Sequence, residues 1–293
     1  MRIVFFGIYD IGVRSLTSLL SRKQNIVAVV TKPDSAVERQ PVADCATAQG
    51  LTLFQPESPK QDDFVREITS LRPDLMIVAG YHKVIPGRVL SVPAWGTINL
   101  HGSLLPKYRG PCPWKHAIAN GEETTGVTVH IMTTELDRGD VLAQRRIPID
   151  EDDTGASLFA KISDVGARVL TEVVDQIQSG EVTKTPQVEE SATYQGYPSE
   201  EETRIDWHAG AEKVRNLARG MYPSPRAWTV IKGLRIKVGK VFLTPQASNL
   251  DPGTIVQVHP DRLQVATSTS DVIISELTAG NNELVNVSDL GVC

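Results

Sequence analysis

Short apolar runs alternate with amphipathic stretches over the first half of the chain. Four apolar runs have the length of buried strands, at residues 2–7, 25–34, 51–56 and 74–81. The windows between them have helical spacing, at residues 11–22, 41–50 and 61–72. Such alternation is typical of βαβ units with a parallel sheet that is covered on both faces. The pattern therefore predicts a doubly wound α/β domain.

The second half begins with the same kind of pattern and then changes. Residues 113–122 and 154–180 have helical spacing, and residues 124–132 and 139–149 have that of strands. Thr154 suits the N-cap of the longer helix and Gly180 its end. Short strands separated by turns then predict a small β-rich, barrel-like domain. We therefore expect an α/β domain at residues 1–185, a polar connecting segment at 186–206 and a β-rich domain at 207–293.

Composition and charge limit the class of protein, the location and the partners that this sequence is expected to have. With 41% hydrophobic and 22% charged residues, the chain has the balance of a globular protein. No stretch reaches the roughly eighteen apolar residues that a membrane span needs, so we expect no membrane partner and a cytoplasmic location. Cys45, Cys112 and Cys293 stand far apart, which favours reduced thiols. The net charge of −5 argues against a nucleic-acid partner without excluding RNA. The pattern predicts no particular oligomeric state.

Two polar side chains mark the end of a predicted strand in GTINLHG, residues 96–102. Alternate residues of a strand point to the same face, so Asn99 and His101 project together. Open α/β folds bind ligands beyond the carboxyl ends of their parallel strands. The pair is therefore presented where a ligand is expected.

The first strand ends in FFGIYDIG, residues 5–12, where a turn leads into a helix. Such a unit can bind anions, but Gly7 and Gly12 match neither the dinucleotide fingerprint nor the Walker pattern. Gly7 either permits the turn only, or the loop from Ile8 to Ile11, which includes Tyr9 and Asp10, contacts a phosphate or a polar substrate through its backbone N–H groups. Both interpretations stay open.

NLHGSLLPKYRG at residues 99–110, followed by GVTVH at 126–130 and LDRGDVL at 136–142, resembles the 10-formyltetrahydrofolate-dependent formyltransferase family. The resemblance extends over nearly the whole chain. By position, the family's catalytic Asn, His and Asp fall on Asn99, His101 and Asp137, and Asp140 is a neighbour of the matched aspartate. The resemblance implies an enzyme that transfers a formyl group from 10-formyltetrahydrofolate to a primary amine.

This chemistry accounts for the residue types. When an amine attacks the formyl carbon, an oxyanion develops and the amine must lose a proton. An amide N–H of Asn99 can stabilise the oxyanion, and the imidazole of His101 titrates near neutral pH. Asp137 would orient His101 and raise its pKa, or hold a water that relays protons.

The resemblance also implies where folate binds. The family holds the pterin largely through backbone groups of two loops, with apolar side chains around it. In this sequence the corresponding residues are Tyr81, His82, Lys83, Val84, Ile85, Thr133, Thr134, Glu135 and Leu136. Lys83 either meets the glutamate tail of folate or is a solvated lysine. The remaining histidines have no ligand spacing, so we expect no metal.

The acceptor is the open part of this interpretation. Family members that act on tRNA carry an extended basic loop after the second strand, whereas here Lys32 and Arg39 are offset by Asp34 and Glu38. We therefore expect a small-molecule amine such as a nucleotide-linked amino sugar. Its binding residues would be Tyr9, Asp10, Ser103, Lys107 and Arg109, with the two cations on a diphosphate. The alternatives are transfer to methionyl-tRNA and hydrolysis of 10-formyltetrahydrofolate.

Overall fold

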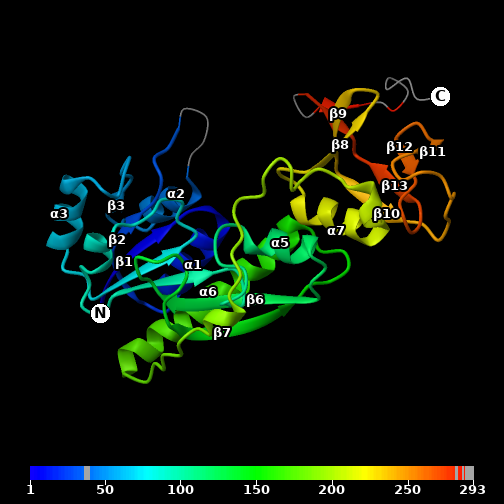
Figure 1. The fold of residues 1–293 in the computed structure, drawn as a ribbon. Helices are drawn as coiled ribbons and strands as arrows, with labels where there is room; N and C mark the ends of the chain where they lie inside the picture. The colour runs from blue at the N-terminus through cyan, green and yellow to red at the C-terminus, as the bar shows by residue number, and fades with distance from the viewer. Residues whose placement is uncertain (36–39, 281–282, 286, 288–293) are drawn as a thin grey trace. The chain divides into compact units, whose positions relative to one another are not determined.

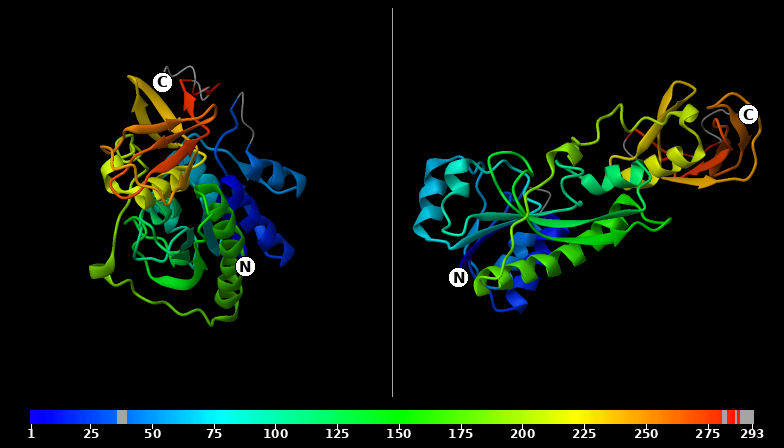
Figure 2. Two further views of the ribbon diagram at one scale, coloured as in Figure 1. Left: turned by 90° about the vertical axis from the view of Figure 1, so that its right-hand side faces the viewer. Right: turned by 60° about the horizontal axis from the view of Figure 1, so that its bottom comes forward.

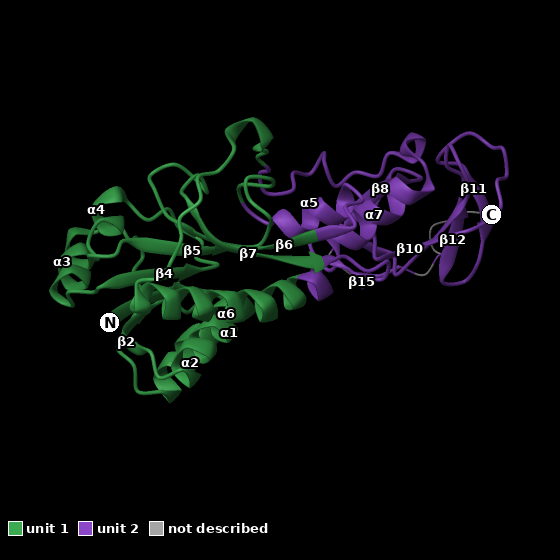
Figure 3. Ribbon diagram, turned by 90° about the horizontal axis from the view of Figure 1, so that it is seen from below, with its two compact units in different colours: residues 1–110, 125–147, 159–194 green, residues 111–124, 148–158, 195–293 purple. Residues whose placement is uncertain are grey.

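The structure is a computed structural model that describes residues 1–35, 40–280, 283–285 and 287 (Figure 1). It divides into two compact units, coloured separately in Figure 3. The first unit comprises residues 1–110, 125–147 and 159–194, and the second comprises residues 111–124, 148–158 and 195–293. Glu38, Arg39 and Cys293, which entered the predictions, lie outside the described residues.

A seven-stranded sheet in the order β3-β2-β1-β4-β5-β6-β7 forms the centre of the first unit. Its strands are β1 (Arg2–Gly7), β2 (Asn25–Val30), β3 (Leu53–Phe54), β4 (Leu75–Ala79), β5 (Thr97–His101), β6 (Thr124–Ile131) and β7 (Val141–Pro148). The pairs from β3 through β5 are parallel, which confirms the predicted doubly wound α/β fold. Strand β6 runs antiparallel to β5, a pairing that the sequence pattern did not predict.

Helices cover both faces of this sheet (Figures 1 and 2). They are α1 (Tyr9–Ser21), α2 (Pro41–Ala48), α3 (Asp62–Ser70), α4 (Gly87–Leu90) and α6 (Gly155–Ser179). Phe64 of α3 and Val89 of α4 share one core cluster with Val4, Phe6 and Val78 of the strands. Burying such side chains stabilises the fold by about 1.5–3 kcal/mol each.

The opposite face of the sheet is covered by α1 and α6. Ser18 of α1 and Thr171 of α6 are hydrogen-bonded through their hydroxyls at 2.8 Å. A Cβ on Gly166 of α6 would lie 2.8 Å from the side chain of Leu100 on β5. The absence of a side chain at Gly166 therefore lets α6 pack closely against the sheet. Because strand side chains alternate, Leu100 points to α6 while its neighbours Asn99 and His101 point to the other face.

Helix α6 begins and ends where the sequence predicts. The Oγ1 of Thr154 accepts the Ser157 N–H at 3.2 Å, and the Thr154 N–H donates to the Ser157 Oγ at 2.9 Å. This reciprocal cap satisfies two backbone N–H groups at the helix start, those of Thr154 and Ser157. Gly180 follows the helix with φ of +77°, the left-handed conformation that glycine adopts without strain.

The second unit contains the predicted C-terminal β-rich domain. One antiparallel sheet contains β8 (Ala227–Ile231), β9 (Leu234–Val238), β14 (Thr278–Ala279) and β15 (Glu283–Leu284), and the other contains β10 (Lys240–Leu243), β11 (Ile255–Val258), β12 (Arg262–Val265) and β13 (Val272–Ser275). Ile236 and Ile274 share one core with Val214 of helix α7 (Ala211–Met221). Both sheets therefore enclose a common apolar interior, as the barrel-like pattern predicted.

Helix α5 (Pro113–Ala119) and residues 148–158 also belong to the second unit, although they precede its C-terminal strands by far in sequence. Arg219 of α7 donates to the carbonyl oxygens of Asp150 at 3.0 Å and Asp153 at 3.1 Å. The division of the chain at residues 185 and 206 stays a prediction. Among the described helices, none combines the length and apolar character required to cross a bilayer.

We expect Thr154→Ala to lower the free energy of unfolding by about 1 kcal/mol, because the Ser157 N–H loses its cap. Urea denaturation of the wild type, Thr154→Ala and Thr154→Ser measures this. The serine variant keeps the hydroxyl and should stay close to the wild type. Equal stability of the alanine and serine variants would contradict the capping role.

Candidate active site

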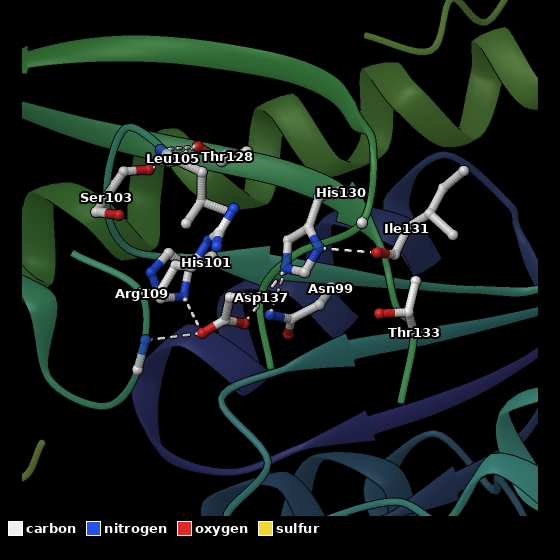
Figure 4. A network of polar contacts seen from close by, with 12 residues as sticks. Asn99, His101, Ser103, Leu105, Arg109, Thr128, His130, Ile131, Thr133 and Asp137 are labelled. Carbon is white, nitrogen blue, oxygen red and sulfur yellow. Dashed lines mark hydrogen bonds and ion pairs between the residues drawn. The ribbon is translucent and has the colours of Figure 1, made fainter. Parts of the chain in front are cut away.

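The register of three neighbouring strands gathers polar side chains on one face of the sheet. Asn99 lies between Val78 of β4 and His130 of β6, and His101 is paired with Thr128. Residues paired across neighbouring strands share a face. Asn99, His101 and His130 therefore project together (Figure 4). Leu100, between Asn99 and His101, points to the other face.

The ring of His101 is fixed by a backbone carbonyl. Its Nε2 lies 2.9 Å from the Tyr108 carbonyl oxygen, which can only accept, so Nε2 carries a proton. In the neutral ring, Nδ1 then has the lone pair, and it lies 3.6 Å from Oδ2 of Asp137. Nδ1 is thus the atom of His101 that can take up a proton, and a carboxylate stands beside it (Figure 4).

Asp137 lies in the loop between β6 and β7 and adopts φ of +54°, the left-handed region that non-glycine residues rarely occupy. Its Oδ2 accepts the Gly110 N–H at 2.9 Å. Its Oδ1 lies 3.5 Å from Nε2 of His130. At Gly139 a Cβ would lie 1.9 Å from the Ile131 carbonyl oxygen, so only glycine fits there. The tight path of this loop is what carries the carboxylate to the two histidines.

His130 is a buried member of the site, although its sequence position suggested no role beyond the lack of metal-ligand spacing that it shares with the other histidines. Its Nδ1 donates to the Ile131 carbonyl at 2.9 Å. Nε2 of the neutral ring is therefore an acceptor, and Nδ2 of Asn99 lies 3.1 Å from it (Figure 4). Finding His130 required the antiparallel register of β5 and β6, which no local pattern reveals.

Burial dominates the titration of His101. It lowers the pKa of His101 more than the charge of Asp137 raises it; the charge of His130 lowers it further, and the hydrogen bond to Tyr108 raises it. The expectation that Asp137 raises this pKa is correct for that one contribution, but the net shift is downward. At neutral pH His101 is therefore a neutral base.

The pKa of Asp137 is lowered, whereas burial alone would raise the pKa of a carboxyl group. Burial raises its pKa, but the charge of His101, the hydrogen bond and charge of His130, and the Gly110 N–H together hold the pKa well below its usual range. His101 and His130 have these effects in their protonated forms, because only then can Nε2 of His130 donate to Oδ1 of Asp137. Asp137 is therefore ionised wherever His101 is neutral.

The two segments predicted for folate lie next to each other. Residues 81–85 follow β4, residues 133–136 precede Asp137, and a Cβ on Gly87 would lie 3.1 Å from Cγ2 of Thr134. Val84 and Leu136 are 76% and 54% exposed, which leaves apolar side chains available to a flat ring system. These observations fit a pterin site with backbone groups and apolar contacts.

Other predicted folate residues have partners within the protein. Ile85 belongs to the core cluster beneath α3 and α4. The Tyr81 ring packs against Phe6 with centroids 5.4 Å apart, and burial raises the pKa of Tyr81 to about 12. Lys83 donates through Nζ to the carbonyl oxygens of Pro56 and Glu57. His82, Thr133 and Glu135 are also part of these two segments.

The residues predicted for the acceptor fall into two groups. Tyr9 is exposed, with φ of +57°, and the Asp10 carboxylate pairs with Arg14 at 2.6 Å. Buried Ser103 donates to the Lys107 carbonyl at 2.7 Å and closes the loop after β5, while the Lys107 side chain is exposed.

Arg109 is buried, and its guanidinium contacts Glu189 and Gln187. Within the described parts of the chain, no group of three or more His, Cys, Asp or Glu side chains is suited to a metal ion. The expected absence of a metal stays a prediction. Cys45 and Cys112 are free cysteines, and the reduced state of the thiols stays a prediction.

We expect the Hε1 proton of His101 to titrate by NMR with a midpoint below the ordinary 6.5, because the ring is buried. Asp137→Asn should move this midpoint lower still, since the raising effect of the carboxylate is lost. The matched control is Asp140→Asn in the same loop, which should leave the midpoint unchanged. A midpoint above 6.5, or a rise in Asp137→Asn, would contradict the described electrostatics.

Comparison with known proteins supports the resemblance seen in the sequence. Residues 1–174 match the formyl transferase family, and residues 199–291 match the formyl transferase C-terminal domain. The methionyl-tRNA formyltransferase of Caldanaerobacter subterraneus subsp. tengcongensis is 39% identical over 94% of this chain and 92% of its own length. That of Acetivibrio thermocellus is 38% identical over 99% of this chain and 95% of its own length.

Solved structures share the fold at lower identity. HypX from Aquifex aeolicus in complex with tetrahydrofolic acid aligns with a TM-score of 0.71 at 20% identity, over 99% of this chain and 46% of HypX. An N-formyltransferase from Helicobacter canadensis, in complex with folinic acid and dTDP-3-aminofucose, aligns with a TM-score of 0.67 at 17% identity, over 93% of this chain and 98% of that chain.

These findings correct the predicted acceptor. The expectation of a small-molecule amine such as a nucleotide-linked amino sugar is wrong, because relatives at 34–39% identity over most of the chain are methionyl-tRNA formyltransferases. The prediction that Lys107 and Arg109 bind a sugar diphosphate rested on that acceptor and falls with it. The motifs, the fold and the matched domains all support 10-formyltetrahydrofolate as the formyl donor. The chain therefore belongs to the formyl transferase family, the 10-formyltetrahydrofolate-dependent N-formyltransferases that its motifs resemble.

Proposed function

We propose that this protein transfers the formyl group of 10-formyltetrahydrofolate to the amino group of methionyl-tRNA. The observation that carries the proposal is the likeness to methionyl-tRNA formyltransferases, at 38% identity over 99% of this chain and 95% of the relative. The N-formyltransferase that was solved with dTDP-3-aminofucose is only 17% identical, a level that supports a common fold and no more.

His101 acts as the general base in this proposal. Its Nε2–H is held by the Tyr108 carbonyl, so Nδ1 receives the proton that the attacking amine loses. The imidazolium then returns this proton to the departing N10 as its bond to the formyl carbon breaks, which leaves His101 neutral again. The carboxylate of Asp137, 3.6 Å from Nδ1, stabilises the imidazolium that results. The lowered pKa of His101 keeps it in the basic form at neutral pH.

Asn99 stabilises the oxyanion that develops on the formyl oxygen. A side-chain amide carries two N–H bonds, and His130 accepts one of them at 3.1 Å. The second N–H can then donate to the oxyanion, with its direction fixed by the first. Loss of one such donor typically lowers kcat by about a hundred- to a thousandfold.

The folate would be held by residues 81–85 and 133–136. Val84 and Leu136 offer apolar contact, and the surrounding backbone offers donors and acceptors for the pterin edge. When bound, the folate supplies an activated formyl group on its N10. The loop of residues 133–136 continues directly into Asp137, so donor binding and placement of the carboxylate involve the same stretch of chain.

The acceptor tRNA requires cations for its phosphates. The second unit carries Arg235 and Lys237 on β9, Lys232 in the turn before it and Lys240 on β10. Lys240 pairs with Glu276 at 2.6 Å, and Arg235 pairs with Glu200 and lies 4.2 Å from the Trp228 ring. Exposed pairs of this kind contribute little to stability, so phosphates can replace the carboxylates.

We expect the purified protein to formylate charged initiator methionyl-tRNA at the expense of 10-formyltetrahydrofolate. His101→Ala should fold normally and lose turnover by at least about a hundredfold, because the proton acceptor is gone. Acid-gel separation of formylated tRNA measures the product, with uncharged tRNA as the control. Donor consumption without any acceptor would instead point to a hydrolase, and failure to formylate methionyl-tRNA would sink the proposal.

A further inference from the structure

Residues 185–194 of the first unit run along both loops of the active site, although the sequence indicated a connecting segment there. Thr185 exchanges backbone hydrogen bonds with Val141 at 2.8 and 2.9 Å. Farther along, the Thr193 carbonyl accepts the Arg109 N–H at 2.8 Å, and the Thr193 Oγ1 accepts the Tyr108 N–H at 2.8 Å. The segment is therefore attached to the loop after β5 and to the start of β7.

Gln187 lies within this segment and uses its amide fully. Nε2 donates to the carbonyl oxygens of Asp137 and Gly139, both at 2.8 Å. Oε1 accepts from Nε of Arg109 at 3.2 Å and from Nη2 at 2.8 Å. Two donors and two acceptor sites are all that a carboxamide offers, so its orientation is fixed.

Arg109 connects this amide to both members of the His101–Asp137 pair. Its buried guanidinium forms a bidentate pair with Glu189, at 3.0 and 2.8 Å. The preceding carbonyl, that of Tyr108, receives the Nε2–H of His101. The following N–H, that of Gly110, donates to Oδ2 of Asp137. A shift of Arg109 would therefore disturb the histidine and the carboxylate together.

The backbone of Asp137 needs such support. With φ of +54°, it occupies a conformation that persists only where surrounding contacts hold it. Gln187 donates to the carbonyl of Asp137 itself and to that of Gly139, and so holds the strained turn at both of these positions.

We propose that Gln187 is a positioning residue that keeps the Asp137 carboxylate against Nδ1 of His101. It contacts no reacting atom and acts through Asp137, while Arg109 and Glu189 hold its amide. The proposal rests on the proposed function for its kinetic readout, but the placement of Asp137 can be measured without any acceptor.

Gln187→Leu tests this by removing all four hydrogen bonds without adding charge. Asp137 and His130 are the charged or titratable groups that act on His101; of the two only Asp137 raises its pKa, an effect that the hydrogen bond to the Tyr108 carbonyl shares. Displacement of Asp137 should therefore lower the NMR midpoint of His101, as in Asp137→Asn. We expect kcat for formyl transfer to fall about a hundredfold, as small misplacements do, with the KM for the donor within about twofold.

The double variant Gln187→Leu/Asp137→Asn separates positioning from a structural role. If Gln187 acts through Asp137, kcat of the double variant should equal that of Asp137→Asn. A multiplicative loss together with an unchanged His101 midpoint would overturn the proposal. The matched control is Gln176→Leu on the exposed side of α6, which should leave kcat and the midpoint unchanged.

Gln187→Glu serves if the leucine variant does not fold. It still accepts from Arg109 but cannot donate to the carbonyls of Asp137 and Gly139. Measured well above the His101 midpoint, its kcat should fall in the wild-type background and stay unchanged in Asp137→Asn. Equal losses in both backgrounds would refute the proposal. Should the wild type formylate no acceptor, the proposed function fails, whereas the His101 midpoints still decide the role of Gln187.

Discussion

The buried carboxylate of Asp137 is the constraint on which the site depends. A buried charge is costly unless it is paired and hydrogen-bonded. Here Oδ2 accepts the Gly110 N–H, and the two carboxylate oxygens lie 3.6 Å from Nδ1 of His101 and 3.5 Å from Nε2 of His130, which pair with them when the rings are protonated. Meeting these partners requires the left-handed turn at Asp137 and the close approach of Gly139 to the Ile131 carbonyl. The strained loop and the buried charge therefore depend on each other.

Much of this architecture could be predicted from local pattern. The apolar runs gave the parallel strands because central strands bury both faces, and Thr154 and Gly180 gave the ends of α6 because caps depend on neighbouring residues alone. The shared face of Asn99 and His101 followed from strand alternation. Asp137 was predicted from a motif, since nothing local ties it to a histidine 36 residues earlier in the chain.

The residues that sequence reasoning missed act across long separations. His130 reaches Asn99 only through the antiparallel register of β6, and Gln187 reaches Asp137 from 50 residues away. The polar stretch at residues 186–206 resembles a linker because it has few apolar residues, whereas Gln187 is tied to the site by hydrogen bonds to the backbone carbonyls of Asp137 and Gly139. The acceptor was misjudged for a related reason: neither the overall charge nor the absence of one extended basic loop indicates where on the surface individual cations lie.

The most direct test of the central claim is the pH dependence of single-turnover formyl transfer to methionyl-tRNA. If neutral His101 beside Asp137 takes the proton, the rate should rise with pH through one step below 6.5, at the midpoint that NMR gives for the His101 ring. A rate that is independent of pH in this range, or the same step in His101→Ala, would contradict the account.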